Sequence, residues 1–277
     1  MTLPPPIVSR TNARVKALRA ASGGDASEPG EMLAIEGENL ILEAVRSGVK
    51  LDTVFVREGN TDVVKRPTIA GLEAANWAVL SEDVFAGAVA TASPQGLAAM
   101  VLIPELAAMD FTKGSGVVLV VESVQDPGNL GTLLRSAEAF GVKQVFVTPD
   151  TVNRWNPKAV RASAGSVFRV PVARAPLIAI KEFLNSFGYK LYAGVAQGAQ
   201  TIAVMDASLM APCALLIGNE GRGLSAAALD LADRQISIPC AVESLNAAIA
   251  GSTLMYEAMR QNMLRDGAEM RRAEGTA

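Results

Sequence analysis

The sequence predicts an α/β protein of two domains, on three observations. Short apolar segments alternate with helical segments along most of the 277 residues. Residues 117–124 form a continuous, valine-rich run, which is typical of a strand covered on both faces. Between the two halves, residues 103–116 contain Pro104, Gly114 and Gly116 without a regular period, and we place the domain boundary there.

The first domain is expected over residues 1–105. Residues 9–21 are predicted to form a basic helix, and the loop after it is rich in glycine and serine. A second helix is expected over residues 38–47. Short strands complete a small α/β domain, and they are expected at residues 33–35, 53–56, 77–80 and 97–102.

The second domain is expected over residues 114–277 and starts with the strand at residues 117–124. Further strands, with helices between most of them, are expected at residues 144–148, 190–195, 214–217 and 235–238. This alternation predicts a mainly parallel sheet wrapped by helices. In open sheets of this kind, ligands bind outside the carboxyl ends of the strands.

The composition limits the chemistry. The chain has no histidine, which excludes Ser-His-Asp and Cys-His nucleophiles, HExxH metal sites and imidazole acid/base catalysis. Cys213 and Cys240 lie far apart without a CxxC pattern, so we expect two buried, small apolar residues rather than a disulfide or a metal site. No apolar run reaches the roughly 18 residues of a membrane span, and the N-terminus lacks a targeting pattern. We therefore expect a cytoplasmic protein with no membrane partner.

The first candidate loop is Gln-Asp-Pro-Gly-Asn-Leu-Gly at residues 125–131, which follows the strand at 117–124 and opens a helix. Asn129 lies at the start of this helix, where its side chain can cap the helix or face a ligand. Arg135 follows less than two turns later. Taken singly, Asn129 is also explained as a cap and Arg135 as a solvated helix residue.

Two further loops also follow apolar strands. Residues 216–225 contain three glycines that allow a close approach of the backbone, with Glu220 on a tight turn. The spacing is not that of a dinucleotide fingerprint or a P-loop, so a tight connection remains an alternative to a ligand cradle. Residues 236–246 lead into another helix, with Ser244 as its expected cap and Asn246 in its first turn.

Together the three loops resemble the three signature motifs of the SpoU (TrmH-like) family of RNA ribose 2′-O-methyltransferases, in the family's order and near its spacing. Residues 156–171 resemble the segment between motifs one and two. Residues 35–40, Glu43-Ala44 and 95–99 resemble the N-terminal substrate-binding domain of many members, a fold related to ribosomal protein L30e. The resemblance covers residues 7–262.

This resemblance implies a SPOUT-type methyltransferase domain with a deep trefoil knot, next to an N-terminal L30e-like domain. It also implies S-adenosylmethionine as the cofactor, RNA as the substrate, and a homodimer whose active site forms at the subunit interface. True knots are nearly absent from proteins, so the resemblance alone implies the knot.

The family's functional positions carry over to matching residues of this chain. The catalytic positions are Asn129, Arg135, Glu220, Ser244 and Asn246. The positions whose backbone holds the cofactor are Gly218, Ile238 and Leu245. Arg135 is the family's proposed activator of the 2′-hydroxyl, but a guanidinium normally keeps its proton, with a pKa above about 12. Orienting the neighbouring phosphate and stabilising a developing alkoxide is chemically easier for it. Asn129 and Glu220 would then orient Arg135 or the ribose.

The third motif departs from the family pattern. Only four residues separate Pro239 from Ser244, where relatives usually carry a longer loop. We therefore expect a tighter cofactor-facing loop, which weakens the assignment of Ile238 relative to that of Gly218.

Although the net charge of the chain is −3, it has two basic regions, and the resemblance implies that they bind RNA. Residues expected to contact RNA phosphates are Arg10, Arg14, Lys16, Lys158 and Arg161. Base readout is expected from the N-terminal domain or from Trp155, and the alternative is that both regions are solvated faces. The favoured substrate is ribosomal RNA, in particular 23S. The alternatives are the same reaction on transfer RNA, and a non-enzymatic RNA-binding or ribosome-assembly factor.

Overall fold

The computed structural model describes residues 3–66, 72, 75–107, 110–111, 116–198 and 201–274, with only the backbone for residues 266–274. It divides into two compact units. Unit 1 contains residues 1–105 and 153–169, and unit 2 contains residues 106–152 and 170–277. Part of the expected domain boundary, residues 108–109 and 112–115, lies outside the described residues. The domain ranges 1–105 and 114–277 stay predictions.

Unit 1 is built on a four-stranded mixed sheet in the order β1-β4-β2-β3. The strands are β1 (Met32–Glu36), β4 (Leu97–Leu102), β2 (Leu51–Arg57) and β3 (Trp77–Leu80), and each contains the strand expected for it. β4 pairs antiparallel with both β1 and β2, whereas β2 and β3 are parallel. The expected relation of this unit to L30e stays a prediction.

Several helices surround this sheet: α1 (Ala13–Ala21), α2 (Glu38–Arg46), η1 (Glu58–Lys65) and α3 (Glu82–Ala86). The basic helix starts at Ala13 rather than at residue 9, because Asn12 caps it by accepting a hydrogen bond from the Arg14 backbone N–H at 2.9 Å. Val15 and Leu18 face inward and join a core that includes Phe55. The basic side chains of α1 are therefore left on its solvent face.

Residues 153–169 also group with unit 1, although along the chain they lie between two strands of unit 2. They contain α5 (Pro157–Ala162) and η4 (Ser166–Phe168). Arg169 donates hydrogen bonds to Glu43 Oε2 at 3.0 Å and to Ser47 Oγ at 2.8 Å. In the predicted domain ranges these residues fall in the second domain, because their contacts with unit 1 are not visible in the order of the chain.

Unit 2 is a seven-stranded sheet in the order β7-β6-β5-β10-β8-β11-β9, and every pairing in it is parallel. The strands are β5 (Val117–Val121), β6 (Gln144–Val147), β7 (Val172–Arg174), β8 (Lys190–Val195), β9 (Ile202–Ala203), β10 (Cys213–Ile217) and β11 (Arg234–Ser237). The predicted parallel sheet is confirmed. Two short strands, β7 and β9, were not expected, because two or three residues are too few to show a period.

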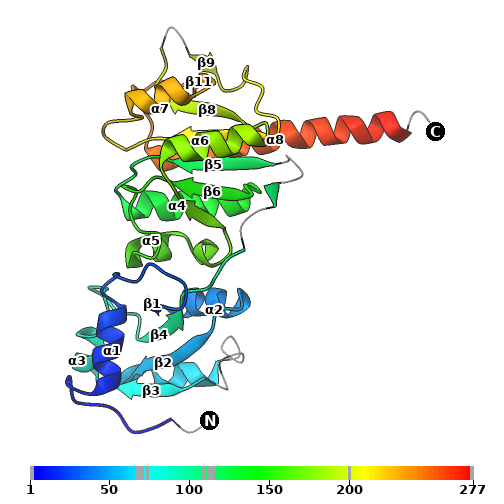
Figure 1. Ribbon diagram of the computed structural model, residues 1–277. Coiled ribbons are helices and arrows are strands. Elements are labelled where there is room, and N and C mark those ends of the chain that lie inside the picture. The colour runs from blue at the N-terminus through cyan, green and yellow to red at the C-terminus, as the bar shows by residue number, and fades with distance from the viewer. Residues whose placement is uncertain are drawn as a thin grey trace. The chain divides into compact units, whose positions relative to one another are not determined.

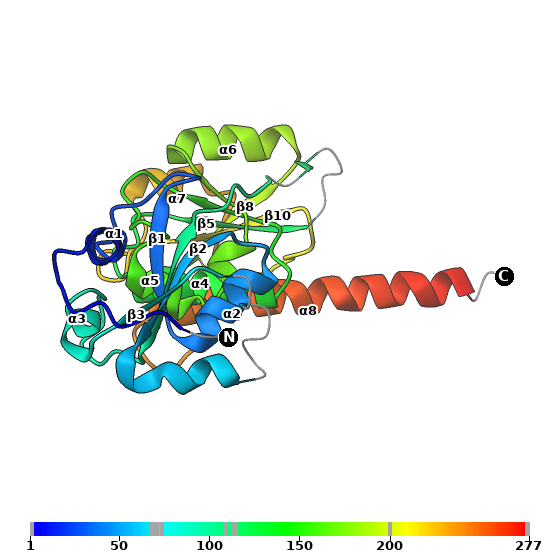
Figure 2. The ribbon, with the colours of Figure 1, turned by 90° about the horizontal axis from the view of Figure 1, so that it is seen from below.

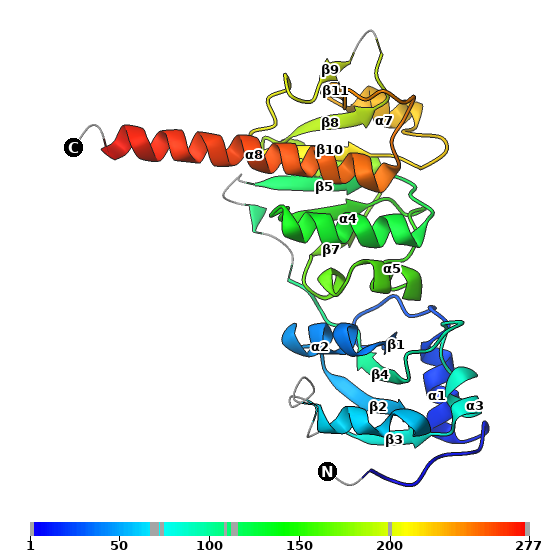
Figure 3. The same cartoon turned by 180° about the vertical axis from the view of Figure 1, so that it is seen from behind.

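Helices cover both faces of this sheet, and these are α4 (Pro127–Ala139), α6 (Leu177–Ser186), α7 (Ala226–Leu231) and α8 (Ala247–Glu274). α6 and α7 lie on the face seen in Figure 1, and α4 and α8 lie together on the opposite face, seen in Figure 3. The second half of α8 extends beyond the sheet (Figure 2). The trefoil knot itself stays an expectation from the family resemblance.

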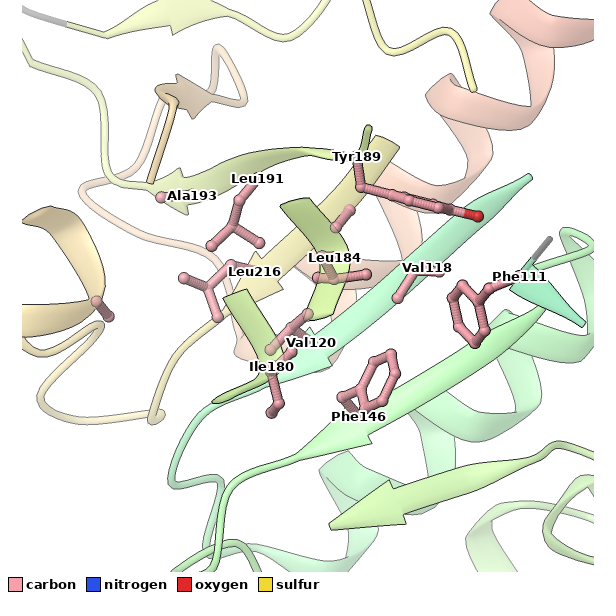
Figure 4. Packing of buried hydrophobic residues seen from close by; sticks show 12 residues of the cluster. Phe111, Val118, Val120, Phe146, Ile180, Leu184, Tyr189, Leu191, Ala193 and Leu216 are labelled. Carbon is pink, nitrogen blue, oxygen red and sulfur yellow. The ribbon is translucent and has the colours of Figure 1, made fainter. Parts of the chain in front are cut away.

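The core beneath α6 shows why β5 and β10 are apolar throughout. Val118 and Leu216 point into the same cluster as Phe146 and Leu184, as Figure 4 shows. All five residues of β5 and all five of β10 are buried. Because these two strands are fixed from both faces, the loops that leave their carboxyl ends start from rigid positions.

Candidate active site

Three polar side chains from three separate segments, Asn129, Glu220 and Asn246, meet beside the carboxyl ends of β5, β10 and β11. Asn129 Nδ2 donates a hydrogen bond to Glu220 Oε1 at 2.9 Å. Asn246 Nδ2 donates to Asn129 Oδ1 at 3.0 Å. Asn129 therefore joins the other two residues through both ends of its amide group.

Asn129 is available for these contacts because another residue caps α4. Asp126 is the N-cap, and its Oδ1 accepts a hydrogen bond from the Asn129 backbone N–H at 2.9 Å. Pro127 occupies the first helical position, where its missing N–H costs nothing. Of the two uses expected for Asn129, the cap is wrong, and its side chain faces the site.

Glu220 is held as a carboxylate by the start of α4. Its two oxygens accept hydrogen bonds from the backbone N–H groups of Gln125 at 3.3 Å and Asp126 at 3.2 Å, besides that from Asn129. Partial burial alone raises the pKa of Glu220, but these hydrogen bonds together lower the pKa below its ordinary value. Glu220 is therefore an orienting anion and a weak base near neutral pH.

Asn246, rather than Ser244, caps α8. Its Oδ1 accepts hydrogen bonds from the backbone N–H groups of Ala248 at 2.9 Å and Ile249 at 3.2 Å. The expected cap at Ser244 is wrong, because α8 begins at Ala247 and Ser244 lies too far ahead of it. Ser244 is exposed and lies on the wall of the cavity described next.

A cavity of about 320 Å³ opens beside these loops in unit 2. Its wall includes Gly218, Ile238 and Leu245, the three residues expected to hold the cofactor, together with Ser244 and Glu220. The shortened third loop thus still brings Ile238 to the cavity.

Other residues of the wall carry no motif by which the sequence would identify them. Gly194, Val195 and Gln197 come from the end of β8, and Leu254 comes from α8. The three residues at the end of β8 lie on the wall because β8 lies between β10 and β11 in the sheet. The order of strands in a sheet does not follow from the sequence, so only the tertiary structure identifies this part of the wall.

The cavity fits S-adenosylmethionine in both its size and its chemistry. Its volume lies in the range of small-molecule sites. Ile217, Ile236 and Leu254 supply an apolar wall for a flat base, and the carboxylates of Glu220 and Glu243 suit a cationic ligand. The tight turn beside Gly218 has no room for a side chain, since a Cβ there would lie 2.5 Å from the carbonyl carbon of Gly223.

Arg135 is not brought to this network by its own chain. Arg135 follows Asn129 by six helical positions, which places it about 9 Å along α4 and about 120° around the axis. The face of α4 that packs on α8 is marked by the hydrogen bond between Ser136 Oγ and Ser252 Oγ, at 2.6 Å. The side chain of Arg135 is exposed, and among the residues that the structure describes none makes a hydrogen bond or an ion pair with its guanidinium.

The five basic residues expected to contact RNA all belong to unit 1. Arg10, Arg14 and Lys16 are exposed on or just before α1, and Lys158 and Arg161 are exposed on α5. Trp155, in contrast, cannot stack on a base. Its ring is fully buried against Phe168, with the Arg154 guanidinium 4.7 Å above it. The expectation of base readout by Trp155 is therefore wrong.

The cysteines differ in their environments. Cys213 is buried in β10, and burial raises the pKa of its thiol to about 12, as expected for a structural residue. Cys240 is partly exposed and lies on the cavity wall, so the expectation that it is buried is wrong.

Within the described ranges, no group of three or more acidic or cysteine side chains is arranged to hold a metal ion. The helices described are all too short or too polar to cross a membrane.

This chain is similar in sequence and in fold to known RNA methyltransferases. Residues 116–256 match the model of the SpoU rRNA Methylase family. The chain is 34% identical to the 23S rRNA (guanosine(2553)-2′-O)-methyltransferase RlmP of Bacillus subtilis, over 80% of this chain and 86% of that protein.

Solved structures agree along nearly the whole chain. An RNA 2′-O ribose methyltransferase superposes with a TM-score of 0.78 at 30% identity, covering 93% of this chain and 99% of its own. An AdoMet-bound rRNA methyltransferase from Sinorhizobium meliloti superposes with a TM-score of 0.76 at 26% identity, covering 92% and 97%. With its three loops meeting at one cavity and these matches on both sequence and fold, the chain belongs to the SpoU rRNA methylase family.

Proposed function

We propose that this protein transfers a methyl group from S-adenosylmethionine to the 2′-hydroxyl of a ribose in ribosomal RNA, in particular 23S RNA. The observation that carries the proposal is the hydrogen-bonded series Glu220, Asn129, Asn246 beside the cavity. The 34% identity to a 23S rRNA 2′-O-methyltransferase favours the ribosomal substrate over transfer RNA.

The cofactor supplies a methyl group activated by a positively charged sulfur, so the protein's task is alignment and charge stabilisation. Gly218, Ile238 and Leu245 line the cavity and would hold the cofactor there through their backbone groups. Asn129 is locked by Glu220 and Asn246, which fixes the direction of its amide. That fixed amide, with Ser244 on the cavity wall, orients the ribose hydroxyl.

Arg135 enters this site from a second copy of the chain. Its own chain leaves it exposed and away from Asn129, while α8 presents two large exposed apolar side chains, Ile249 at 56% and Tyr256 at 49%. Tyr256 also packs on Phe140, the C-cap residue of α4, with the ring centroids 5.7 Å apart. A homodimer that covers this α4–α8 face would bury these side chains and place Arg135 at the partner's cavity.

Arg135 then orients the phosphate beside the target ribose and stabilises the oxygen as its proton passes to solvent water. Glu220, with its lowered pKa, does not take that proton. Unit 1 supplies the RNA affinity through Arg10, Arg14 and Lys16 of the α1 region and Lys158 and Arg161 of α5. A cytoplasmic location is part of the same proposal.

The proposal is tested with cofactor labelled in its methyl group. The protein is incubated with 23S RNA and with transfer RNA, both transcribed without modifications, and the label is mapped after digestion. We expect a 2′-O-methylated nucleotide in 23S RNA. Label in transfer RNA alone would assign the second substrate, label on a base would overturn the reaction type, and absence of cofactor binding in calorimetry would favour the non-enzymatic alternative.

A further inference from the structure

We propose that Glu122 is a positioning residue that holds the loop at residues 218–225 in the shape the cofactor cavity requires. The inference rests on the proposed use of this cavity for S-adenosylmethionine. Glu122 directly follows β5, is only 8% exposed and belongs to none of the sets assigned above. Its backbone N–H donates to the Ile217 carbonyl at 2.8 Å, which places it opposite the start of the loop.

The carboxylate of Glu122 binds the far end of that loop. Oε1 accepts a hydrogen bond from Ser225 Oγ at 2.6 Å, and Oε2 accepts one from the Ser225 backbone N–H at 3.0 Å. No arginine or lysine pairs with Glu122 within the part of the chain that the structure describes. These two donors therefore hold a largely buried charge, and such charged hydrogen bonds are stronger than neutral ones.

Because Glu122 fixes Ser225, it also fixes the two segments beside Ser225, which are the start of α7 and the turn next to the cavity. Its Oγ also accepts a hydrogen bond from the Ala228 backbone N–H at 3.1 Å, which caps α7. Toward the cavity, the chain reverses at once, because Asn219 and Gly223 exchange two backbone hydrogen bonds of 3.0 Å. Gly218 packs directly against this turn, so a displacement of Ser225 moves the cavity wall.

The neighbouring residue holds the near end of the loop. The Ser123 carbonyl accepts a hydrogen bond from Asn219 Nδ2 at 2.8 Å. Ser123 has φ of +56°, a conformation that non-glycine residues rarely adopt, and its N–H donates to Thr148 Oγ1 at 3.0 Å. Two successive residues after β5 thus hold both ends of the loop that carries Glu220, and the conformation of Ser123 is supported by Thr148, which directly follows β6.

The test measures cofactor binding by the full-length protein, using S-adenosylmethionine in calorimetry. For Glu122→Ala we expect the Kd to rise at least ~10-fold, or ~1.4 kcal/mol, because Ser225 loses both acceptors. Glu122→Gln should stay within ~3-fold of the wild type, because its Oε1 can accept from the Ser225 N–H and its Nε2 can donate to Ser225 Oγ.

The matched control is Lys181→Met. Lys181 is also largely buried in unit 2 and ion-paired, to Asp233, but it does not line the cavity. This variant should lose thermal stability and keep the wild-type Kd. Equal increases of Kd in Glu122→Ala and Lys181→Met, or an unchanged Kd in a folded Glu122→Ala, would overturn the proposal.

If Glu122→Ala does not fold, Ser225→Ala tests the same contact, since it removes the hydroxyl and keeps the backbone N–H. The expected rise of Kd is then ~3-fold, and an unchanged Kd in a folded Ser225→Ala would contradict the proposed contact. These readouts use the cofactor alone, so a wrong RNA substrate would leave them unchanged, whereas absence of cofactor binding by the wild type would count against the proposed function.

Discussion

Asn129 and Glu220 lie 91 positions apart in the chain, yet Asn129 Nδ2 donates to Glu220 Oε1 at 2.9 Å. The contact exists because β5 and β10 are neighbours in register, with Val121 opposite Ile217. The loops that follow these strands therefore leave the sheet side by side.

Replacing Asn129 by aspartate should strongly reduce methyl transfer. The new carboxylate would lie against that of Glu220 and could not donate to it, so the local geometry would be lost. We expect kcat to fall about 100-fold or more, in the range found when one oriented polar group is removed. Single-turnover assays with labelled cofactor measure this. Cofactor Kd should change little, because Asn129 is not part of the cavity wall, and a large increase in Kd would contradict the assignment.

The lowered pKa of Glu220 should make the free energy of unfolding depend on pH. Since the pKa of Glu220 is lowered in the folded protein, its ionised form stabilises the fold above the ordinary value of 4.5, and this stabilisation is lost as the pH falls through the lower folded pKa. Denaturant unfolding of the wild type and of Glu220→Gln should therefore differ above pH 4.5 and converge in acid. A difference that grows as the pH falls would mean that the pKa is raised instead.

Arg135 offers a test of the shared active site. Arg135→Ala and Asn129→Ala should each be inactive while still binding cofactor. Mixed dimers of the two would contain one site with both native residues, so re-annealing equal amounts should restore about a quarter of the wild-type activity. Activity that stays at the level of the separate variants would show that both residues act within one chain.

The basic face of α1 should set the dependence of RNA affinity on salt. Replacing Arg14 and Lys16 by alanine removes two exposed cations and should reduce the slope of log K against log salt by about 2. Filter binding at several salt concentrations measures the slope. Lys65→Ala is the matched control in unit 1, since Lys65 is already paired with Asp62 at 2.6 Å. Equal slopes for the double variant and the control would exclude α1 from the RNA interface.

The two cysteines should differ in reactivity. Cys213 is buried and the pKa of its thiol is raised to about 12, so it should resist alkylation at pH 8 until the protein unfolds. Cys240 is partly exposed on the cavity wall and should react, more slowly when S-adenosylmethionine is present. Mass spectrometry of the alkylated peptides gives both rates. Rapid labelling of Cys213 in the native protein would contradict this assignment.

Much of the architecture is local in origin and could be predicted from the sequence. The valine-rich run of β5 and the apolar β10 predict strands buried on both faces, and the alternation with helices predicts a parallel sheet. The loops after β5, β10 and β11 were recognised as candidate sites because ligands bind at the carboxyl ends of such strands. The capping roles expected of Asn129 and Ser244 are wrong, because Asp126 directly precedes α4 and Asn246 directly precedes α8, so their side chains reach the free N–H groups of the first turn.

By itself, the sequence determined the elements, the three loops and the identities of the residues that meet there, because periodicity, turn residues and motif spacing are properties of neighbouring positions. Only the tertiary structure decided which of those residues touch. The order of strands placed the end of β8 on the cavity wall, the contacts of Arg169 assigned residues 153–169 to unit 1, and Ser225 folded back onto Glu122. Such contacts join positions distant along the chain, so they depend on how the whole sheet packs.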